Sequence, residues 1–214
     1  MERRRGRPTS EDPSQISTEV LLDAALEAFA ERGYDGMSVR ELARELGISH
    51  NLIPQRIGRK DELWNAAVEH GFGSVAEALI PVFEDDTAGD DIVRLRALVV
   101  RFIEANAQRP ALLRIINQEA AAPGPRLDLL FDRYIDPVRA FGAALLGRLQ
   151  ASGEVRTSSV ALVYFLMTHG AGGALALPGL AERFGEPIDP ADPEAVHRYA
   201  VGAADVIFDG LLSR

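Results

Sequence analysis

Residues 38–60 read SVRELARELGISHNLIPQRIGRK, and this stretch decides how the N-terminal part of the chain can fold. Ser38, followed by Glu41 three residues later, forms a capping box that predicts the start of a helix. Apolar residues then recur with helical spacing at Val39, Leu42, Ala43 and Leu46. Gly47 is placed to end this helix, and a second short helix follows it. Two short helices around a glycine turn predict a helix-turn-helix.

The second helix has two alternative starts. If Ser49 is its N-cap, Pro54 removes a backbone donor that the helix would use. If Asn51 is the cap, Pro54 falls in the first turn, where its missing N–H has no helical partner. In both cases Ile53 and Ile57 face the core, and polar side chains remain outward. We expect these outward residues to contact DNA bases: Ser49, His50, Asn51 and Gln55. Asn51 and Gln55 are the best suited, because an amide can bond adenine with two hydrogen bonds.

The charge distribution points to the same stretch. From Leu46 to Lys60 there are three cations and no carboxylate. Residues 1–60 carry ten cationic and ten acidic residues, whereas residues 61–214 carry thirteen and twenty-two, so the net charge of −9 lies entirely in the larger part. An acidic body repels DNA, and we therefore expect contact only through the N-terminal part. The basic side chains after the second helix predict phosphate contacts: Arg56, Arg59 and Lys60.

Composition excludes several classes of protein. The 214 residues are 47% hydrophobic, which is enough for a sizeable core, and the absence of cysteine excludes disulfides and thiolate metal sites. His50, His169 and His197 lie on different expected helices, so no metal site, cofactor or catalytic residue is predicted, and we do not expect an enzyme. No apolar run approaches the length of a membrane span. The sequence predicts a cytoplasmic protein, and the family resemblance described below implies association with the bacterial nucleoid.

Three regions are expected. Residues 1–15 form a basic arm, in which Arg5-Gly6-Arg7-Pro8 resembles the core of an AT-hook. This predicts that Arg5 and Arg7 enter the minor groove. The alternative is a basic terminus that only aids solubility. Residues 16–60 form the helix-turn-helix domain, and residues 61–214 form an all-helical body, giving an all-α fold of about nine helices.

Several helices are predicted in more detail. The first runs from near Ser17 to Arg32 and is ended by Gly33. A helix from Asp61 is expected to break or curve at Gly71 and Gly73. In the body, an apolar stripe over 130–149 predicts a long helix kinked at Pro137. The segment 158–177 is apolar nearly all round, which predicts a helix buried from two sides, and a proline-rich connection over 178–193 leads to a last helix over 193–212.

The N-terminal part strongly resembles the tetracycline-repressor (TetR) family of bacterial transcriptional regulators. The resemblance is carried by LLDAALEAFAERGYDGMSVRELARELGIS at 21–49 and by GRKDEL at 58–63. It implies a three-helix DNA-binding head on a helical body that binds a ligand and dimerises. It also implies that Ser38, Arg40 and Lys60 hold the DNA backbone. The chain departs from the family pattern at Pro54 and Ile57, where a Tyr and a Phe are common.

Two further surfaces are predicted in the body. Polar groups beside apolar stripes are candidates for an effector pocket that takes a hydrophobic or amphipathic small molecule: Phe102, Asn117, Glu119, Tyr134, Thr168 and His169. Small residues near the C-terminus allow close helix approach and predict a homodimer interface: Gly170, Gly173, Ala174, Ala200, Ala203 and Ile207.

These expectations combine into one hypothesis. The chain is interpreted as a ligand-responsive transcriptional regulator that binds a near-palindromic site on double-stranded DNA as a homodimer, and the resemblance implies a repressor. The rival interpretation is a helical small-molecule-binding protein whose head no longer binds DNA, and Pro54 is the residue that favours this rival.

Overall fold

The computed structural model describes residues 16–84 and 89–212, and it confirms the all-α fold class. These described residues contain no strand, and one isolated antiparallel bridge joins Val155 to Leu212. The chain divides into two compact units, Met1–His70 and Gly71–Arg214, which we call the head and the body. Within the described ranges, no helix combines the length and the apolar character needed to cross a membrane.

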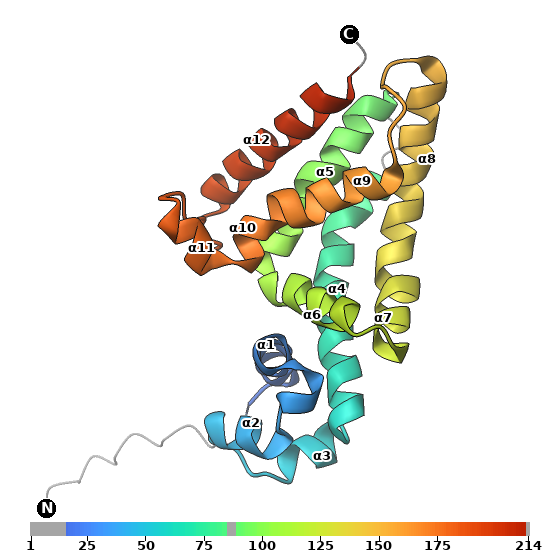
Figure 1. Cartoon of the computed structure of the whole chain (residues 1–214). Coiled ribbons are helices and arrows are strands. Elements are labelled where there is room, and N and C mark those ends of the chain that lie inside the picture. Colours follow the sequence, from blue (N-terminus) through green and yellow to red (C-terminus); the bar gives the residue numbers. More distant parts are fainter. Residues whose placement is uncertain (1–15, 85–88, 213–214) are drawn as a thin grey trace, which may run out of the picture. The chain divides into compact units, whose positions relative to one another are not determined.

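The head consists of three helices and the first turns of a fourth (Figure 1): α1 (Thr18–Gly36), α2 (Val39–Glu45), α3 (Leu52–Arg56) and α4 (Lys60–Glu84). The side chain of Ser17 caps α1 by accepting a hydrogen bond of 3.2 Å from the backbone N–H of Val20. All four helices contribute fully buried side chains to one core: Leu21, Phe29, Leu42, Ile53, Leu63 and Trp64. Burial of these large apolar groups is the main force that holds the helices of the head together.

The end of α1 differs from the prediction. Its helical backbone is interrupted at Gly33, which has φ 70° and ψ 168°, but helical geometry resumes and the element ends at Gly36. A positive φ needs glycine here, although this ψ lies outside the left-handed helical region that was expected. The interruption turns Tyr34 toward the core, where its ring stacks on Phe29 at 6.0 Å and meets Trp64 edge-on at 6.5 Å.

Helix α4 runs without interruption from Lys60 to Glu84, so the predicted break at Gly71 and Gly73 is wrong. A glycine inside a helix costs only about 1 kcal/mol relative to alanine, and the apolar residues on either side offset this cost. Leu63 and Trp64 are buried in the head, and Val75 and Leu79 are buried in the body.

The body is built around α5 (Asp91–Gln108), which packs along α8 (Asp136–Ser152) and α12 (Pro193–Leu211), as Figure 1 shows. The remaining body elements are α6 (Pro110–Ala121), α7 (Pro125–Leu130), η2 (Phe131–Ile135), α9 (Val160–Phe165), η3 (Leu166–Ala171), α10 (Gly172–Ala176) and α11 (Pro178–Arg183). The core between α5, α8 and α12 is aliphatic and aromatic: Leu95, Leu98, Val99, Leu145, Leu149, Ala204 and Phe208.

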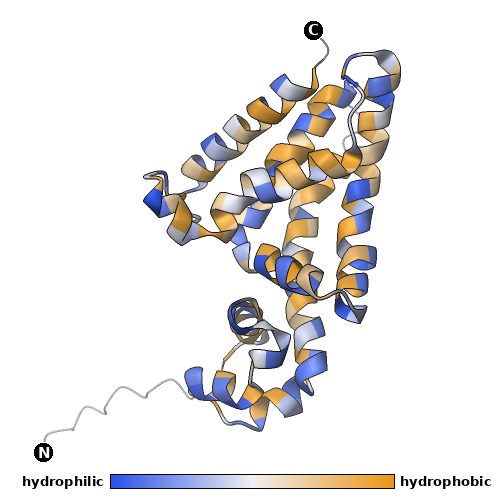
Figure 2. Ribbon diagram, in the orientation of Figure 1, coloured by the Kyte–Doolittle hydropathy of each residue, from blue (hydrophilic) through white to orange (hydrophobic). Residues whose placement is uncertain are grey.

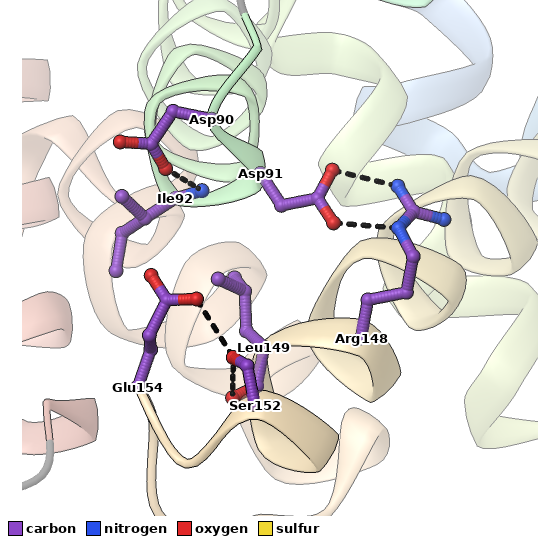
Figure 3. Close-up of polar contacts among 7 residues, drawn as sticks. All are labelled: Asp90, Asp91, Ile92, Arg148, Leu149, Ser152 and Glu154. Carbon is purple, nitrogen blue, oxygen red and sulfur yellow. Dashed lines mark hydrogen bonds and ion pairs between the residues drawn. The ribbon is translucent and has the colours of Figure 1, made fainter.

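Polar contacts fix the start of α5 against the end of α8 (Figure 3). Asp90 caps α5 by accepting a 3.0 Å hydrogen bond from the N–H of Ile92. The next residue, Asp91, accepts two hydrogen bonds from the guanidinium of Arg148 on α8, at 2.5 and 2.8 Å. The cap at Asp90 fixes the first turn of α5, and Asp91 in that turn bonds α8. Helix α8 then ends at Gly153, which has φ 80° and ψ 6°.

The long helix over 130–149 is divided rather than simply kinked. Helix α7 passes into the π-helical segment η2, and α8 begins immediately afterwards with Pro137 in its first turn. Pro137 has no N–H to donate to the preceding turn, and the wider π-helical segment lies where that donor is missing. The sequence therefore predicted an irregularity at the correct place, but the structure has a π-helical segment there instead of a simple kink.

Two other expectations for the body are wrong. The run from α9 through η3 to α10 is not buried from two sides in the single chain, because Leu162, Phe165 and Leu166 are about half exposed. Figure 2 shows α9 almost entirely in the hydrophobic colour. The segment 178–193 is not a plain connection either. Pro178 occupies the first turn of α11, where its fixed φ is compatible with a helix.

Candidate functional site

The turn between α2 and α3 presents the polar surface that the sequence predicted. Gly47 has φ 65°, a conformation that favours glycine, and it follows the end of α2. Ile53 is completely buried and fixes α3 to the head core. The four predicted base-contacting residues all have exposed side chains: Ser49, His50, Asn51 and Gln55. Because their side chains are exposed, all four residues are accessible to a ligand.

Helix α3 begins at Leu52, with Asn51 in the N-cap position, which resolves the two alternative starts. Pro54 is then the third residue of the helix, where a backbone N–H has no intrahelical acceptor. The Asn51 side chain makes no capping bond, and the Ser49 hydroxyl accepts a long, 3.4 Å hydrogen bond from the Asn51 N–H. Pro54 consequently removes no hydrogen bond from α3.

The predicted phosphate-contacting residues differ in how free they are. Arg40 and Arg59 are exposed, and Ser38 is half-buried because its hydroxyl caps α2 by accepting from the N–H of Glu41 at 3.4 Å. The guanidinium of Arg56 donates to the backbone carbonyl of Ile16 at 2.5 Å. Arg56 thereby holds the chain next to the arm, while Arg5 and Arg7 lie outside the described residues.

Lys60 is also engaged within the head. Its ammonium group donates to the carbonyl of Asp35 at 3.2 Å and lies over the Tyr34 ring, 4.8 Å from the ring centre. These contacts hold a positive charge at the first residue of α4. The side chain is only partly exposed, so its charge is positioned by the fold rather than carried on a flexible chain.

The sequence analysis missed Glu62, which lies close in sequence to the predicted phosphate-contacting residues Arg59 and Lys60. Its carboxylate accepts a 2.7 Å hydrogen bond from the N–H of Arg59 and so caps the start of α4. Gly58 leaves room for this cap: a β-carbon at this position would lie 2.1 Å from a Glu62 carboxylate oxygen, and φ is 127°, which L side chains rarely adopt. A glutamate at the third position of a helix is half of a capping box, and this signal could have identified Glu62.

Two polar side-chain contacts, one an ion pair and one a hydrogen bond of a histidine, join helices of the head. Arg32 on α1 bonds both carboxylate oxygens of Glu45 on α2, at 2.8 and 2.9 Å. His70 on α4 contacts Asp23 on α1 at 3.0 Å. Both pairs join different helices of the head, and they hold the geometry on which the exposed residues depend.

The predicted effector-pocket residues are distributed over two cavities in the body. Phe102, Tyr134 and Thr168 line a small cavity of about 30 Å³. Asn117 and His169 line a neighbouring cavity of about 340 Å³, a size that accommodates a small ligand. Glu119 lines neither of them, because both of its oxygens accept from the Nε of Arg126 at 2.9 Å. Its assignment to the pocket was therefore wrong, since a buried carboxylate requires a partner.

Most of the predicted dimer residues are accessible on the surface of the single chain, but one is not. Gly170 is exposed, and Gly173, Ala174 and Ala203 are half-buried. Ala200, in contrast, is completely buried inside the chain, so it cannot meet a partner subunit. Ile207 is nearly buried but lines a groove of about 410 Å³ between η3 and α12, together with Leu166, Gly170, Ala203 and Val206.

Comparison with known proteins identifies the head. Residues 21–67, from α1 into α4, match the family model "Bacterial regulatory proteins, tetR family". The HTH-type transcriptional repressor Rv3405c of Mycobacterium tuberculosis is 37% identical over 51 residues, which are 24% of this chain and 27% of that protein. The match thus spans about a quarter of that relative's length. The uncharacterised HTH-type transcriptional regulator YezE of Bacillus subtilis is 29% identical over 123 residues, covering 50% of this chain and 63% of YezE.

Solved structures share the complete fold. The ketosteroid transcriptional regulator KstR2 of Mycobacterium tuberculosis matches with a TM-score of 0.72 at 22% identity, over 94% of this chain and 98% of that one. The TetR-family regulator PfmR of Thermus thermophilus matches with a TM-score of 0.68 at 20% identity, over 94% and 99%. The head thus matches the DNA-binding region of the tetR family of bacterial regulatory proteins, and the chain as a whole shares the fold of these solved regulators.

Proposed function

We propose that this protein is a DNA-binding transcriptional regulator that acts as a homodimer and responds to a small molecule. The observation that carries the proposal is the corner formed by the α2–α3 turn and α3. Four exposed polar side chains lie there beside the completely buried Ile53. Hydroxyl, imidazole and amide groups of this kind recognise base edges in the major groove, and the neighbouring arginines neutralise phosphates.

The geometry of α3 argues against the rival function, a ligand-binding protein with a degenerate head. That rival depended on damage to the recognition helix by Pro54. Because α3 begins at Leu52, Pro54 lies in the first turn and costs no intrahelical hydrogen bond. Asn51 and Gln55 remain exposed on either side of it, so the residue that favoured the rival leaves the recognition surface intact.

The homodimer is supported by the groove between η3 and α12. Its lining includes the small residues Gly170 and Ala203 and the aliphatic residues Leu166 and Val206, which are 45% and 77% exposed. Small residues allow a helix of a second copy to approach closely, and exposed aliphatic side chains gain from being covered. Two heads related by a twofold axis would meet half-sites about 34 Å apart, which requires a near-palindromic operator.

Ligand response needs only a modest coupling. A ligand that binds one conformation of the dimer more tightly shifts the population toward it, and typical coupling energies of about 1–3 kcal/mol change DNA affinity five- to 150-fold. The cavity of about 340 Å³ beside Asn117 and His169 is the proposed ligand site.

The direct test is DNA binding by the full chain. The DNA upstream of its own gene is tiled into short duplexes, and binding is measured by fluorescence anisotropy over a range of salt concentrations. We expect one duplex to bind at least about a thousandfold more tightly than random DNA, with affinity falling steeply as salt rises. Failure of every duplex and of random DNA to bind at low salt would refute the proposal, and retention of the protein on a ligand column alone would then favour the rival.

A further inference from the structure

Tyr164, on α9, lies at the meeting point of three cavities in the body. It lines the cavity of about 340 Å³, the cavity of about 30 Å³ and a third of about 40 Å³. No other residue of the described ranges lines all three. The two smaller cavities leave space beside its ring, so Tyr164 has room to adjust when a molecule enters the largest one.

The Tyr164 hydroxyl makes no hydrogen bond with any described residue. Tyr199 provides a contrast in the same body, because its hydroxyl donates to the carbonyl of Ala171 at 2.5 Å. Burial raises the pKa of Tyr164 above its usual value, so at neutral pH the group remains a protonated donor. Tyr164 is half-buried and lines the largest of the three cavities, so its hydroxyl is a donor that a ligand in this cavity can use.

The other polar groups of the large cavity also offer donors. Arg139 bonds Asp136 through its Nε at 2.7 Å and through one terminal nitrogen at 2.5 Å, which leaves its second terminal nitrogen outside this ion pair. No aspartate or glutamate is among the described residues that line the three cavities. Donors in excess of acceptors favour a ligand whose polar end is rich in acceptors.

A chain of hydrogen bonds fixes the remaining polar wall. The Thr168 hydroxyl donates its only proton to the carbonyl of Tyr164 at 2.9 Å. It must then accept from His169 Nδ1 at 2.8 Å, so that nitrogen carries a proton. His169 Nε2 lies 3.0 Å from the amide of Asn117. This chain of contacts fixes the Asn117 amide and the His169 ring, both of which line the largest cavity.

The rest of the cavity wall is apolar and includes Ile116, Ile135, Val160 and Phe165. We propose that the effector is a carboxylate with an apolar chain, whose carboxylate accepts hydrogen bonds from Tyr164 and Arg139 and whose chain lies along this apolar wall. The proposal names the ligand class for the effector site and therefore rests on the proposed function.

The first test compares three probes of equal chain length: decanoate, decanol and decylamine, each used below its micellar concentration. Binding to the full-length protein is measured by isothermal titration calorimetry. Because charge-assisted hydrogen bonds are about twice as strong as neutral ones, we expect decanoate to bind at least about tenfold more tightly than decanol. Decylamine should bind least. Equal affinity for decanoate and decanol would overturn the proposal.

Two variants test the assigned groups. Tyr164→Phe should weaken decanoate binding about tenfold, the loss of roughly one hydrogen bond to a charged acceptor. It should leave the Tm of the unliganded protein unchanged or higher, because the hydroxyl has no partner within the described residues. Arg139→Gln should reduce the preference for decanoate over decanol. Arg101→Gln is the matched control, since Arg101 is an exposed arginine that also pairs three residues along its helix, with Glu104. Unchanged decanoate binding by Tyr164→Phe would refute the role of its hydroxyl.

The same preparations separate this proposal from the proposed function. Duplex binding by the unliganded protein is measured alongside the probes. Duplex binding without preference for decanoate would refute the ligand class alone. Decanoate binding that responds to both variants, without any duplex binding, would support the cavity assignment and refute the function as a DNA-binding regulator.

Discussion

The head and the body use the same kind of secondary structure for different purposes. In the head, four helices, two of them short, pack around one core that includes Ile53 and Trp64, and the polar side chains of the α2–α3 turn remain exposed. In the body, long helices leave internal cavities and an apolar groove unfilled. The comparison suggests that the head recognises its target with side chains on a packed surface, whereas the body recognises its ligands with spaces between helices.

The largest predicted effect concerns the groove of the body. Val206→Arg places a charge on a residue that is 77% exposed in the single chain and that we expect a second copy to cover. Burying an unpaired charge costs about 3–5 kcal/mol, so dimer affinity should fall at least about a hundredfold. Sedimentation velocity measures the change. Val93→Arg, an equivalent change at a 52% exposed valine on α5, should remain a dimer, and a dimeric Val206→Arg variant would exclude this groove as the interface.

The next prediction tests the packed core of the head. Ile53→Ala should lower the free energy of unfolding of the head by about 2–5 kcal/mol, because Ile53 is completely buried. Trp64 is the chain's only tryptophan and is buried in the head, so its fluorescence follows head unfolding, whereas circular dichroism follows mainly the larger helical body.

Leu98→Ala, in the core of the body, is the matched control for this variant. We expect it to shift the circular dichroism transition more than the Trp64 transition, the reverse of Ile53→Ala. Identical shifts of both transitions in both variants would show that the head and the body unfold as one cooperative unit, which would contradict this prediction.

A smaller effect separates two kinds of contact within the head. Gln55→Ala should cost about 1–3 kcal/mol on the operator and much less on random DNA, because it removes a base contact. Lys60→Ala should weaken both duplexes equally and reduce the salt slope by about one, because Lys60 is expected to contact phosphate. Anisotropy titrations on both duplexes at several salt concentrations provide the comparison. If the two variants lose affinity equally on both duplexes, the roles assigned to these residues are incorrect.

The smallest prediction concerns the exposed pair between α5 and α8. The hydrogen bond from Arg148 lowers the pKa of Asp91 below its usual value. A carboxylate with a lowered pKa stabilises the fold above its unfolded-state pKa, and this contribution is lost as the pH falls through the folded-state value. The Tm difference between the wild type and Asp91→Asn should therefore be small and constant above about pH 4 and should close below it. A difference that widens on acidification would contradict this sign.

The sequence predicted the head well because its signals are local. The capping serines, the glycine turn and the spacing of apolar residues each depend on a few neighbouring positions. The choice between Ser49 and Asn51 as the cap could not be made in this way, because serine and asparagine are both favourable N-cap residues. Arg56 and Lys60 were recognised as cations, but their bonds to the carbonyls of Ile16 and Asp35 join residues far apart in the sequence.

The body was predicted less well because its features depend on packing between distant helices. Glu119 and Thr168 both appear in the sequence as polar residues beside apolar stripes. Only the fold shows that Glu119 is bonded to Arg126, whereas Thr168 lines a cavity. Ala200 and Ala203 differ by three residues, yet one is buried inside the chain and the other lines the groove. Composition cannot distinguish such neighbours.

The late start of α3 has an evolutionary consequence. Ser49 and His50 precede the first helical residue, so neither has to be a good helix former, and neither contributes a large side chain to the core. Selection can exchange them at little cost in folding, since the only bond lost is the long one from the Asn51 N–H to the Ser49 hydroxyl. A duplicated copy of this gene could therefore acquire a new operator through substitutions in the turn alone, while Ile53 and Pro54 keep the short helix in its place.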